Sequence, residues 1–283
     1  MPVLRSTVLV DAPQRTVAGL LRDADTAAEA LGRSGHSMTA PARLLRVDDE
    51  VGFLVRVLPG LRFAVHTRIT RTDQAGFASE LVTGRLRALT HTTTVSAAGS
   101  ATRVVDEITW SSPWGPLGRC ADLVLVGGLV RRLLAARTAV LLQRAAALAG
   151  HPVVVATAIV RDGRVLAAQR TRPPALAGRW ELPGGRVEAG EPEPDAVVRE
   201  CREELGAKVR VTGRLGTDLP MPAGLLRVYT AEIVDGSAEP RALEHAEVRW
   251  LAAAEVADVD WVETDRAVLH DLVDLLRVAP AGA

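Results

Sequence analysis

The sequence has little sulfur, few aromatic rings and no long apolar run. Its two cysteines, Cys120 and Cys201, are too few for a disulfide framework. Aromatic residues make up 3% of the 283 residues, so the cores must consist mainly of Val, Leu and Ala. No apolar run reaches the roughly 18 residues of a membrane span. The start, MPVLRSTVLVDAP, lacks the basic region and apolar core of a signal peptide. These absences predict a soluble cytoplasmic protein that does not act at a membrane.

The sequence also lacks a charge of one sign. Lys+Arg and Asp+Glu each total 34, and the formal net charge is zero. Proteins dedicated to nucleic acid binding normally carry a basic surplus, so no nucleic acid polymer is expected as a partner. Lys208 is the only lysine, which indicates a coding bias rather than an adaptation to phosphate.

The length and one short segment predict two domains. A chain of 283 residues exceeds one typical domain. The segment AAALAGHP at 145–152 joins a helical pattern to a strand pattern, with Gly150 as a helix stop and Pro152 unable to continue a helix. The expected domains are 1–149 and 150–283.

The first half reads as a strand, a helix, a run of alternating strands and a long helix. The first strand is expected at 4–10 and the helix at 11–31, with Asp11 as N-cap and Pro13 in its first turn. The last helix is expected at 119–148, with a bend at Gly127-Gly128. Between the two helices, apolar alternation predicts strands at 52–57, 61–70, 79–82, 87–95 and 102–110.

This order of elements resembles the helix-grip fold of the polyketide-cyclase/START-like superfamily (SRPBCC). The segment SSPWGPLGRCADLVLVGGLVRRLLAAR is similar to the entry into that superfamily's last helix. The resemblance covers about 145 residues, rests on pattern alone, and implies a cavity for an apolar ligand between sheet and helix. No active site is expected here. His66 and His91 show no acidic or nucleophilic partner in register, and Trp110, Trp114 and Cys120 are interpreted as core or cavity wall.

The second half opens with an expected hairpin and continues to a short helix. Strands are predicted at 153–160 and 165–169, around the turn Arg161-Asp-Gly163. Pro192 marks a helix start and Gly206 its stop, which gives about 14 residues. Its apolar stripe is Ala196, Val197, Cys201 and Leu205.

Three glutamates share one face of that helix. Glu200, Glu203 and Glu204 stand at i, i+3 and i+4, where carboxylates repel one another. Arg199 and Arg202 are expected to project mainly to other faces. Carboxylate oxygens suit Mg²⁺ or Mn²⁺, and no His/Cys set favours zinc.

The surrounding residues resemble the signature of the Nudix hydrolases, G-x5-E-x7-R-E-U-x-E-E-x-G-U, where U is a bulky apolar residue. The residues in register are Gly185, Glu191, Arg199, Glu200, Cys201, Arg202, Glu203, Glu204, Gly206 and Ala207. Cys201 and Ala207 are small for their apolar positions. The expected fold class is α+β, with an N-terminal helix-grip (START-like) domain and a C-terminal Nudix α/β/α sandwich with a mixed sheet.

The resemblance implies roles for individual residues. The metal ligands would be Glu200, Glu203 and Glu204 with the backbone carbonyl of Gly184. Arg199 would orient the carboxylates, and Glu191 would bond within the turn that leads into the helix. Gly184 and Gly185 allow a tight loop beside the metal.

A further ligand or general base is expected before the last strand. Glu244 stands six residues before Trp250, as in MutT-like members, and Glu247 is the competing candidate. Either Glu200 or Glu244 would accept the proton of the attacking water.

The implied substrate is a nucleoside triphosphate, cleaved to a nucleoside monophosphate and pyrophosphate. Arg170, Arg172 and Arg179 flank the site and are candidates for binding phosphate, with Arg170 preferred. Asp265 matches a position at which relatives contact the base, so both 8-oxo-dGTP and (d)CTP fit. Trp261 and Tyr229 would either stack on the base or lie in the core.

Two alternatives remain open. Within the same chemistry, the substrate could be another nucleoside diphosphate derivative. In a different class, the START-like half would bind a small molecule and the Nudix half would act as a sensor with little turnover.

Overall fold

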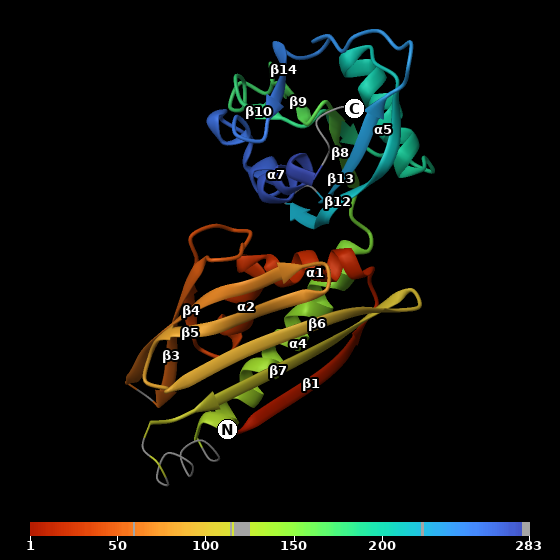
Figure 1. Cartoon of the computed structure of the whole chain (residues 1–283). Coiled ribbons are helices and arrows are strands. Elements are labelled where there is room, and N and C mark those ends of the chain that lie inside the picture. The colour runs from red at the N-terminus through yellow and green to blue at the C-terminus, as the bar shows by residue number, and fades with distance from the viewer. Residues whose placement is uncertain (59, 114, 116–124, 222–223, 279–283) are drawn as a thin grey trace. The chain divides into compact units, whose positions relative to one another are not determined.

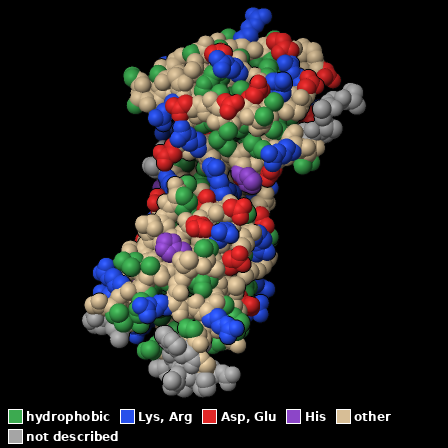
Figure 2. Space-filling view, turned by 60° about the vertical axis from the view of Figure 1, so that its left-hand side comes forward, with side chains coloured by type: hydrophobic (Ala, Val, Ile, Leu, Met, Phe, Trp, Pro, Cys, Tyr) green, Lys and Arg blue, Asp and Glu red, His purple; other side chains and the backbone are tan. Residues whose placement is uncertain are grey.

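The computed structural model describes residues 1–283 except 59, 114, 116–124, 222–223 and 279–283. The chain divides into two compact units, Met1–Gly150 and His151–Ala283 (Figure 1). Within the described ranges, no helix is long and apolar enough to cross a bilayer. Acidic and basic side chains are interspersed on the face shown in Figure 2, in keeping with the zero formal charge.

The first unit is a curled antiparallel sheet with helices, in the order β1-β7-β6-β5-β4-β3-β2 (Figure 1). The helices are α1 (Gln14–Arg22), α2 (Ala24–Arg33) and α4 (Gly127–Leu148). The predicted strands are confirmed to within a few residues, whereas the short β2 was missed. The strands are β1 (Val3–Val10), β2 (Ser37–Thr39), β3 (Glu50–Leu58), β4 (Leu61–Asp73), β5 (Gly76–Thr83), β6 (Ala88–Ala98) and β7 (Ala101–Ser111).

Apolar residues of α1 and α4 pack on one face of this sheet. Val17 and Leu20 of α1 and Leu141 of α4 share a core with Val95 of β6 and Val104 of β7. Further along α4, Val130 and Leu134 pack with Ile108 and Trp110 of β7, so Trp110 is core as predicted. The alternation of the strands therefore places one buried face of the sheet toward the helices.

The predicted helix at 11–31 is wrong in its start and its continuity. Pro13, in an extended conformation, is the N-cap of α1, so Asp11 does not cap the helix. Asp23 then interrupts the helix, because its backbone is extended and its carboxylate is fully buried. Thr26 donates to this carboxylate at 2.8 Å, and Arg144 of α4 donates at 3.1 Å.

The long helix is described only in part. α4 is an α-helix from Gly127 onward and directly follows two π-helical residues at 125–126. The predicted start at 119–124 lies outside the described residues, as do Trp114 and Cys120, so the bend at Gly127-Gly128 stays a prediction.

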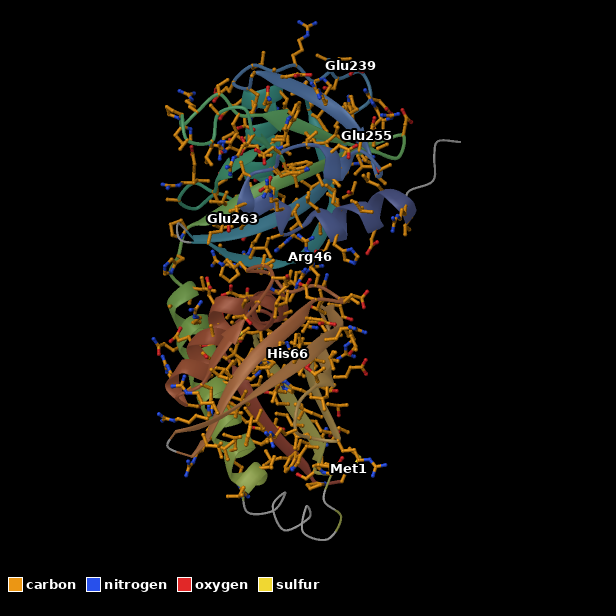
Figure 3. All side chains as sticks on the ribbon, turned by 90° about the vertical axis from the view of Figure 1, so that its left-hand side faces the viewer. Met1, Arg46, His66, Glu239, Glu255 and Glu263 are labelled. Carbon is orange, nitrogen blue, oxygen red and sulfur yellow. The ribbon has the colours of Figure 1, made fainter. Side chains whose placement is uncertain are left out.

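The two histidines of the sheet differ in their surroundings. His66 is exposed on β4, as the alternation predicts (Figure 3). His91 of β6 does have an acidic partner, which corrects the expectation: its Nε2 lies 2.9 Å from Oδ1 of Asp106 on β7. Asp106 pairs with Thr93 in the ladder, so it meets His91 diagonally and not directly across the strands.

The second unit contains a mixed sheet in the order β10-β9-β8-β13-β12, in which β13 runs parallel to β8. β11 pairs with β8, and β14 pairs with β9. The strands are β8 (Val153–Arg161), β9 (Arg164–Gln169), β10 (Trp180–Glu181), β11 (Gly184–Arg186), β12 (Val209–Met221), β13 (Gly224–Ile233) and β14 (Glu247–Ala252). The helices are α5 (Glu193–Leu205), α6 (Glu263–Arg266) and α7 (Leu269–Val278).

β8, the first strand of this unit along the chain, is buried on both faces. Val155 and Ile159 of β8 pack with residues of α5, and the intervening Ala156 and Ala158 are buried as well. A strand covered on both sides is expected to be apolar throughout, as β8 is. The turn after it is the predicted one, with positive φ at Asp162 and Gly163.

Candidate active site

The helix α5 forms where the sequence pattern places it. Its N-cap is Pro192, its first turn carries Glu193 and Asp195, and Gly206 ends it in the left-handed conformation with a φ of 65°. The predicted apolar stripe is fully buried, with Ala196, Val197, Cys201 and Leu205 all inaccessible. Cys201 is therefore core, and burial raises the pKa of its thiol to about 12. The buried stripe fixes which face of α5 carries the glutamates.

A glycine loop lies directly against that face. Gly184 and Gly185 belong to β11, which pairs with Ala156 and Val155 of β8. The N–H of Gly184 donates to the Glu204 carboxylate at 2.9 Å. A Cβ on Gly185 would lie 2.3 Å from Glu200 Oε1, so any other residue at this position would displace that carboxylate. The loop and the helix thus bring Glu200 and Glu204 to one place.

Arg199 is the hub of the hydrogen bonds at the start of the site. It donates to both oxygens of Glu191 at 2.9 and 3.0 Å, to Glu200 at 2.8 Å and to the carbonyl of Arg186 at 2.9 Å. The hydrogen bonds that Arg199 donates to Glu191 and Glu200 raise the pKa of the guanidinium still further. The expectation that Arg199 projects mainly to other faces is wrong, because its length lets it fold back to the loop. Glu191 also accepts from the Glu188 N–H at 3.0 Å, within the turn.

The three glutamates of α5 differ in their surroundings. Burial raises the pKa of Glu200, against the hydrogen bond from Arg199. Burial also raises the pKa of Glu204, to about 7. Glu203 is 54% exposed and lies 3.4 Å from Arg199. The site therefore holds two carboxylates whose ionisation is opposed by burial and a third that reaches into solvent.

As the side chains stand, no three His, Cys, Asp or Glu side chains in the described ranges are arranged to hold a metal ion. Nη1 of Arg199 donates to both Glu200 and Glu203, so these two carboxylates are paired with the guanidinium. The donors nevertheless suit a hard divalent cation, because Glu200 and Glu204 lie by the glycine loop and Glu203, mostly solvated, can rotate toward them. A cation would also offset the cost of ionising Glu204.

Two residues that the sequence reasoning missed join the carboxylates. His245 is buried, and its Nε2 lies 3.1 Å from Oε1 of Glu181 on β10. Although burial lowers the pKa of His245, the hydrogen bond to Glu181 and the charge of Glu204 raise it overall. Glu181 directly precedes the stretch that leads to the glycine loop, and His245 follows Glu244. Only their position so near the loop and the candidate glutamate could have drawn attention to them.

The residues predicted outside α5 lie in several places. Arg170 is paired with Glu181 and so belongs to the carboxylate cluster. Arg179 is partly exposed and lies 3.6 Å from Asp260. Glu244 is 51% exposed, with its carboxylate 3.5 Å from Arg172, and no described contact joins it to the α5 glutamates. Glu247, the competing candidate, pairs with Arg249 on its own strand.

Asp265 and the two aromatic residues are buried. The Leu182 N–H donates to Asp265 Oδ2 at 2.6 Å, so this carboxylate supports the chain that leads into the glycine loop. Trp261 is almost wholly inaccessible and donates to the Val256 carbonyl, and Tyr229 donates to Glu193. Trp261 and Tyr229 were expected either to stack on the base or to lie in the core, and in the structure both lie in the core.

Asp265→Asn is expected to stabilise the second unit at pH 8. Burial raises the pKa of Asp265 to about 7, above the unfolded value, so the folded chain holds the proton more tightly than the unfolded chain. Its contribution to stability is greatest below about pH 4 and is lost as the pH rises to about 7. At pH 8 the variant should gain on the order of 1–4 kcal/mol in free energy of unfolding.

Urea unfolding at pH 5 and pH 8 measures this difference. The gain at pH 8 should shrink at pH 5, and the exposed turn variant Asp235→Asn should show no such change. A variant less stable than the wild type at pH 8 would contradict the prediction.

Comparison with known proteins places this site in a family. Residues 150–272 match the model of the NUDIX domain. The "Putative 8-oxo-dGTP diphosphatase 2" of Mycobacterium tuberculosis is 50% identical over 135 residues, which are 46% of this chain and 94% of the relative. The "CTP pyrophosphohydrolase" of Escherichia coli is 33% identical over 129 residues, which are 45% of this chain and 96% of the relative.

Among solved structures, the solution structure of the E. coli ORF135 protein is similar, with 31% identity and a TM-score of 0.40. The match covers 47% of this chain and 95% of the ORF135 chain. With its helix of three glutamates against a glycine loop, and with relatives matched over nearly their whole length, the chain belongs to the Nudix family, and its second unit is a Nudix hydrolase domain.

Proposed function

We propose that the second unit cleaves a nucleoside triphosphate, of the 8-oxo-dGTP or (d)CTP kind, to a nucleoside monophosphate and pyrophosphate in the presence of Mg²⁺. The observation that carries the proposal is the pair of partly buried carboxylates, Glu200 and Glu204, held against the glycine loop. The names of the two relatives, which mention 8-oxo-dGTP and CTP, support both substrates.

Charge explains why these carboxylates need a cation. A triphosphate brings about four negative charges toward the α5 glutamates, and their mutual repulsion opposes binding. Glu200, Glu203 and Glu204 with the Gly184 carbonyl would hold Mg²⁺, or Mn²⁺ in its place, and Glu244 is a further proposed ligand. When bound, the ion supplies positive charge that acidifies a water molecule and stabilises the leaving pyrophosphate.

The chain's own residues orient the catalytic carboxylate and deprotonate the attacking water. Arg199 holds Glu200 by a hydrogen bond of 2.8 Å, which orients its carboxylate. Because burial raises the pKa of Glu200, it is a stronger base than an exposed glutamate, and we assign it the proton of the attacking water, with Glu244 as the alternative. The water oxygen then bonds to one of the two phosphorus atoms that share the α–β bridging oxygen. The bond from that phosphorus to the bridging oxygen breaks, and its electron pair stays on the bridging oxygen of the leaving group.

Arg170 and Arg179 are proposed to bind phosphate, and Asp265 the base. Arg179 is exposed enough to reach a ligand. Arg170 would have to exchange its pairing with Glu181 for a phosphate. For Asp265, burial implies contact through a protonated carboxyl or through the adjoining chain.

A screen for pyrophosphate release tests the proposal. The purified full chain is assayed with Mg²⁺ over canonical, oxidised and methylated nucleoside triphosphates, and the products are separated. We expect monophosphate and pyrophosphate from 8-oxo-dGTP or (d)CTP, and loss of both products in excess chelator. Turnover restricted to nucleoside diphosphate derivatives would replace this proposal with the first alternative, and no metal-dependent turnover on any nucleotide would favour the sensor.

We further propose that the two units are separate domains, bounded near residue 149, and that the first is a START-like (SRPBCC) helix-grip domain with an apolar ligand. The long helix α4 packed on a curled antiparallel sheet supports this proposal. So does a cavity of about 330 Å³ within the unit.

A further inference from the structure

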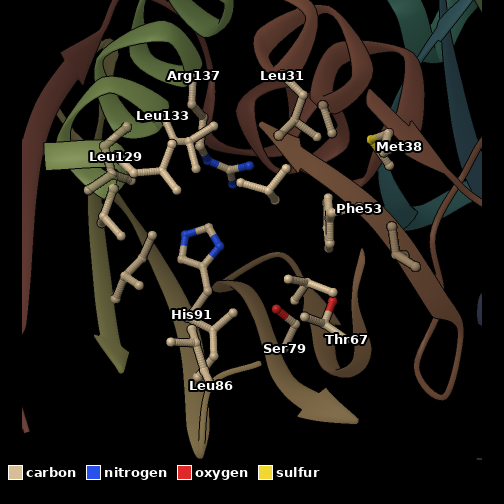
Figure 4. Close-up of a pocket in the computed structure, with 18 of the residues that line it drawn as sticks. Leu31, Met38, Phe53, Thr67, Ser79, Leu86, His91, Leu129, Leu133 and Arg137 are labelled. Carbon is tan, nitrogen blue, oxygen red and sulfur yellow. The ribbon is translucent and has the colours of Figure 1, made fainter. Parts of the chain in front are cut away.

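The first unit holds a cavity lined almost entirely by apolar side chains. Its volume of about 330 Å³ lies in the range of small-molecule sites. Figure 4 shows side chains from α2, the strands, the loop between β5 and β6, and α4 pointing into it, including Leu31, Met38, Phe53, Leu86, Leu129 and Leu133.

Charge of only one sign lines this cavity. Among its described lining residues the charged ones are Arg85 and Arg137, and none is a carboxylate. Arg85 is exposed and lies over the ring of Phe63, whereas Arg137 is largely buried and extends from α4 into the cavity (Figure 4). An apolar cavity whose buried charge is a guanidinium favours an anionic group on its occupant.

Arg137 keeps hydrogen-bonding capacity for such a group. Its Nη2 donates weakly to Thr93 at 3.3 Å, and its buried Nε has no acceptor among the described residues. The carboxylate of Asp106 lies 3.5 Å from that Nε but already accepts from Thr93 at 2.6 Å and from His91 at 2.9 Å. A guanidinium presents five N–H donors, and among the described residues one hydrogen bond is made by those of Arg137.

His91 completes the polar end of the cavity. Burial lowers the pKa of His91, so the ring is neutral at pH 7 and its Nε2–H donates to Asp106. Although burial opposes ionisation of Asp106, the charge of Arg137 and the hydrogen bond from His91 hold its pKa well below the usual range. Asp106 thus remains an anion that anchors His91 and Arg137 from behind, and both side chains face the cavity (Figure 4).

We propose that this cavity binds a small apolar molecule with a single carboxylate, which accepts hydrogen bonds from Arg137 while its apolar body fills the remaining volume. This inference rests on the proposal that the first unit binds a ligand, and it is independent of the hydrolase activity of the second. His91 and Arg137 both contact the carboxylate of Asp106, and His91 helps to orient Arg137 through this shared partner.

Calorimetric titration of the full chain with octanoate and with 1-octanol tests the head group. The two probes share their chain length and differ in charge. We expect the wild type to bind octanoate at least about tenfold more tightly than octanol, since hydrogen bonds to a charged group are the stronger kind. Equal affinity for the two probes, or no octanoate binding by the folded protein, would overturn the proposal.

Variants on α4 then locate the head group. Arg137→Gln should lower octanoate affinity at least about tenfold and leave octanol binding unchanged. Arg132→Gln, an exposed arginine of the same helix, should bind both probes as the wild type does. Circular dichroism confirms that each variant is folded. Octanoate binding that is unaffected by Arg137→Gln, or equally weakened by Arg132→Gln, counts against a site at Arg137.

The hydrolase variant Glu203→Gln separates this inference from the proposed activity. It should bind octanoate as the wild type does, so a failure of nucleotide hydrolysis leaves the ligand titrations interpretable. A loss of octanoate binding in this variant would overturn the independence of the two units' sites.

Discussion

Glu203→Gln is expected to lower metal-dependent nucleotide hydrolysis by at least about 10²–10³-fold, because it removes one charge that would hold the cation and so the charge stabilisation of the leaving group. The substitution should cost little stability. Glu203 is 54% exposed, and its contact with Arg199, at 3.4 Å, is the longest of that arginine's hydrogen bonds. Exposed ion pairs contribute about 0–1 kcal/mol, so the activity loss would not reflect unfolding.

Steady-state kinetics and thermal unfolding, measured on the same preparations, test this separation. Glu232→Gln is the matched control, since Glu232 is a half-exposed glutamate of β13 paired with Arg210. It should retain wild-type turnover. A Glu203→Gln protein that keeps more than about a tenth of the wild-type rate would remove Glu203 from the proposed metal site.

Gly184→Ala should destabilise the second unit and abolish its activity together. The φ of Gly184 is +153°, and an added Cβ would lie 2.1 Å from the Val155 carbonyl oxygen. Backbone strain costs about 1–3 kcal/mol and overpacking about as much again. Relief requires β11 to move from β8, which would also break the hydrogen bond of 2.9 Å from the Gly184 N–H to Glu204.

Gly163→Ala separates the cost of backbone strain from the cost of overpacking. Gly163 also has a positive φ, 68°, but a Cβ there would meet no atom within 4 Å. It should cost about 1–2 kcal/mol and leave turnover intact. Calorimetry should show a fall in the unfolding midpoint on the order of 10 °C for Gly184→Ala. If both variants were equally stable and active, the close contact between β11 and β8 would be refuted.

Local patterns were sufficient for much of the secondary structure. The start, the buried stripe and the end of α5 depend on Pro192, on apolar spacing and on Gly206, all of which act within one or two helical turns. The alternation in β4 similarly predicts that Thr67 and Ile69 are buried and His66 is exposed. Such features are readable because the physical cause lies a few residues away.

Two of the errors have a different cause. Asp23 interrupts the first helix because its buried carboxylate accepts a hydrogen bond from Arg144, which is 121 residues away in the sequence. Asp106 joins His91 through a diagonal pairing across two strands, which depends on the register of the ladder. Both partners come from other elements, so no local pattern reveals them.

The candidate site shows the same division. The spacing of Glu200, Glu203 and Glu204 and the matching glycines already identified the family that the comparisons then showed. The assembly of Glu181 and His245 with these carboxylates, and the burial that raises the pKa of Glu204 to about 7, arise only when β10 and the segment before β14 fold beside the glycine loop.

By itself the sequence determined the helix of three glutamates, its glycine loop and the family, because periodicity, capping and motif spacing are properties of neighbouring residues. The tertiary structure alone decided the electrostatics of that site, the polar end of the cavity at Arg137 and His91, and the burial of Asp265. Burial and charge pairing are sums over groups that are distant in the chain, and only the folded arrangement brings them within a few ångströms of one another.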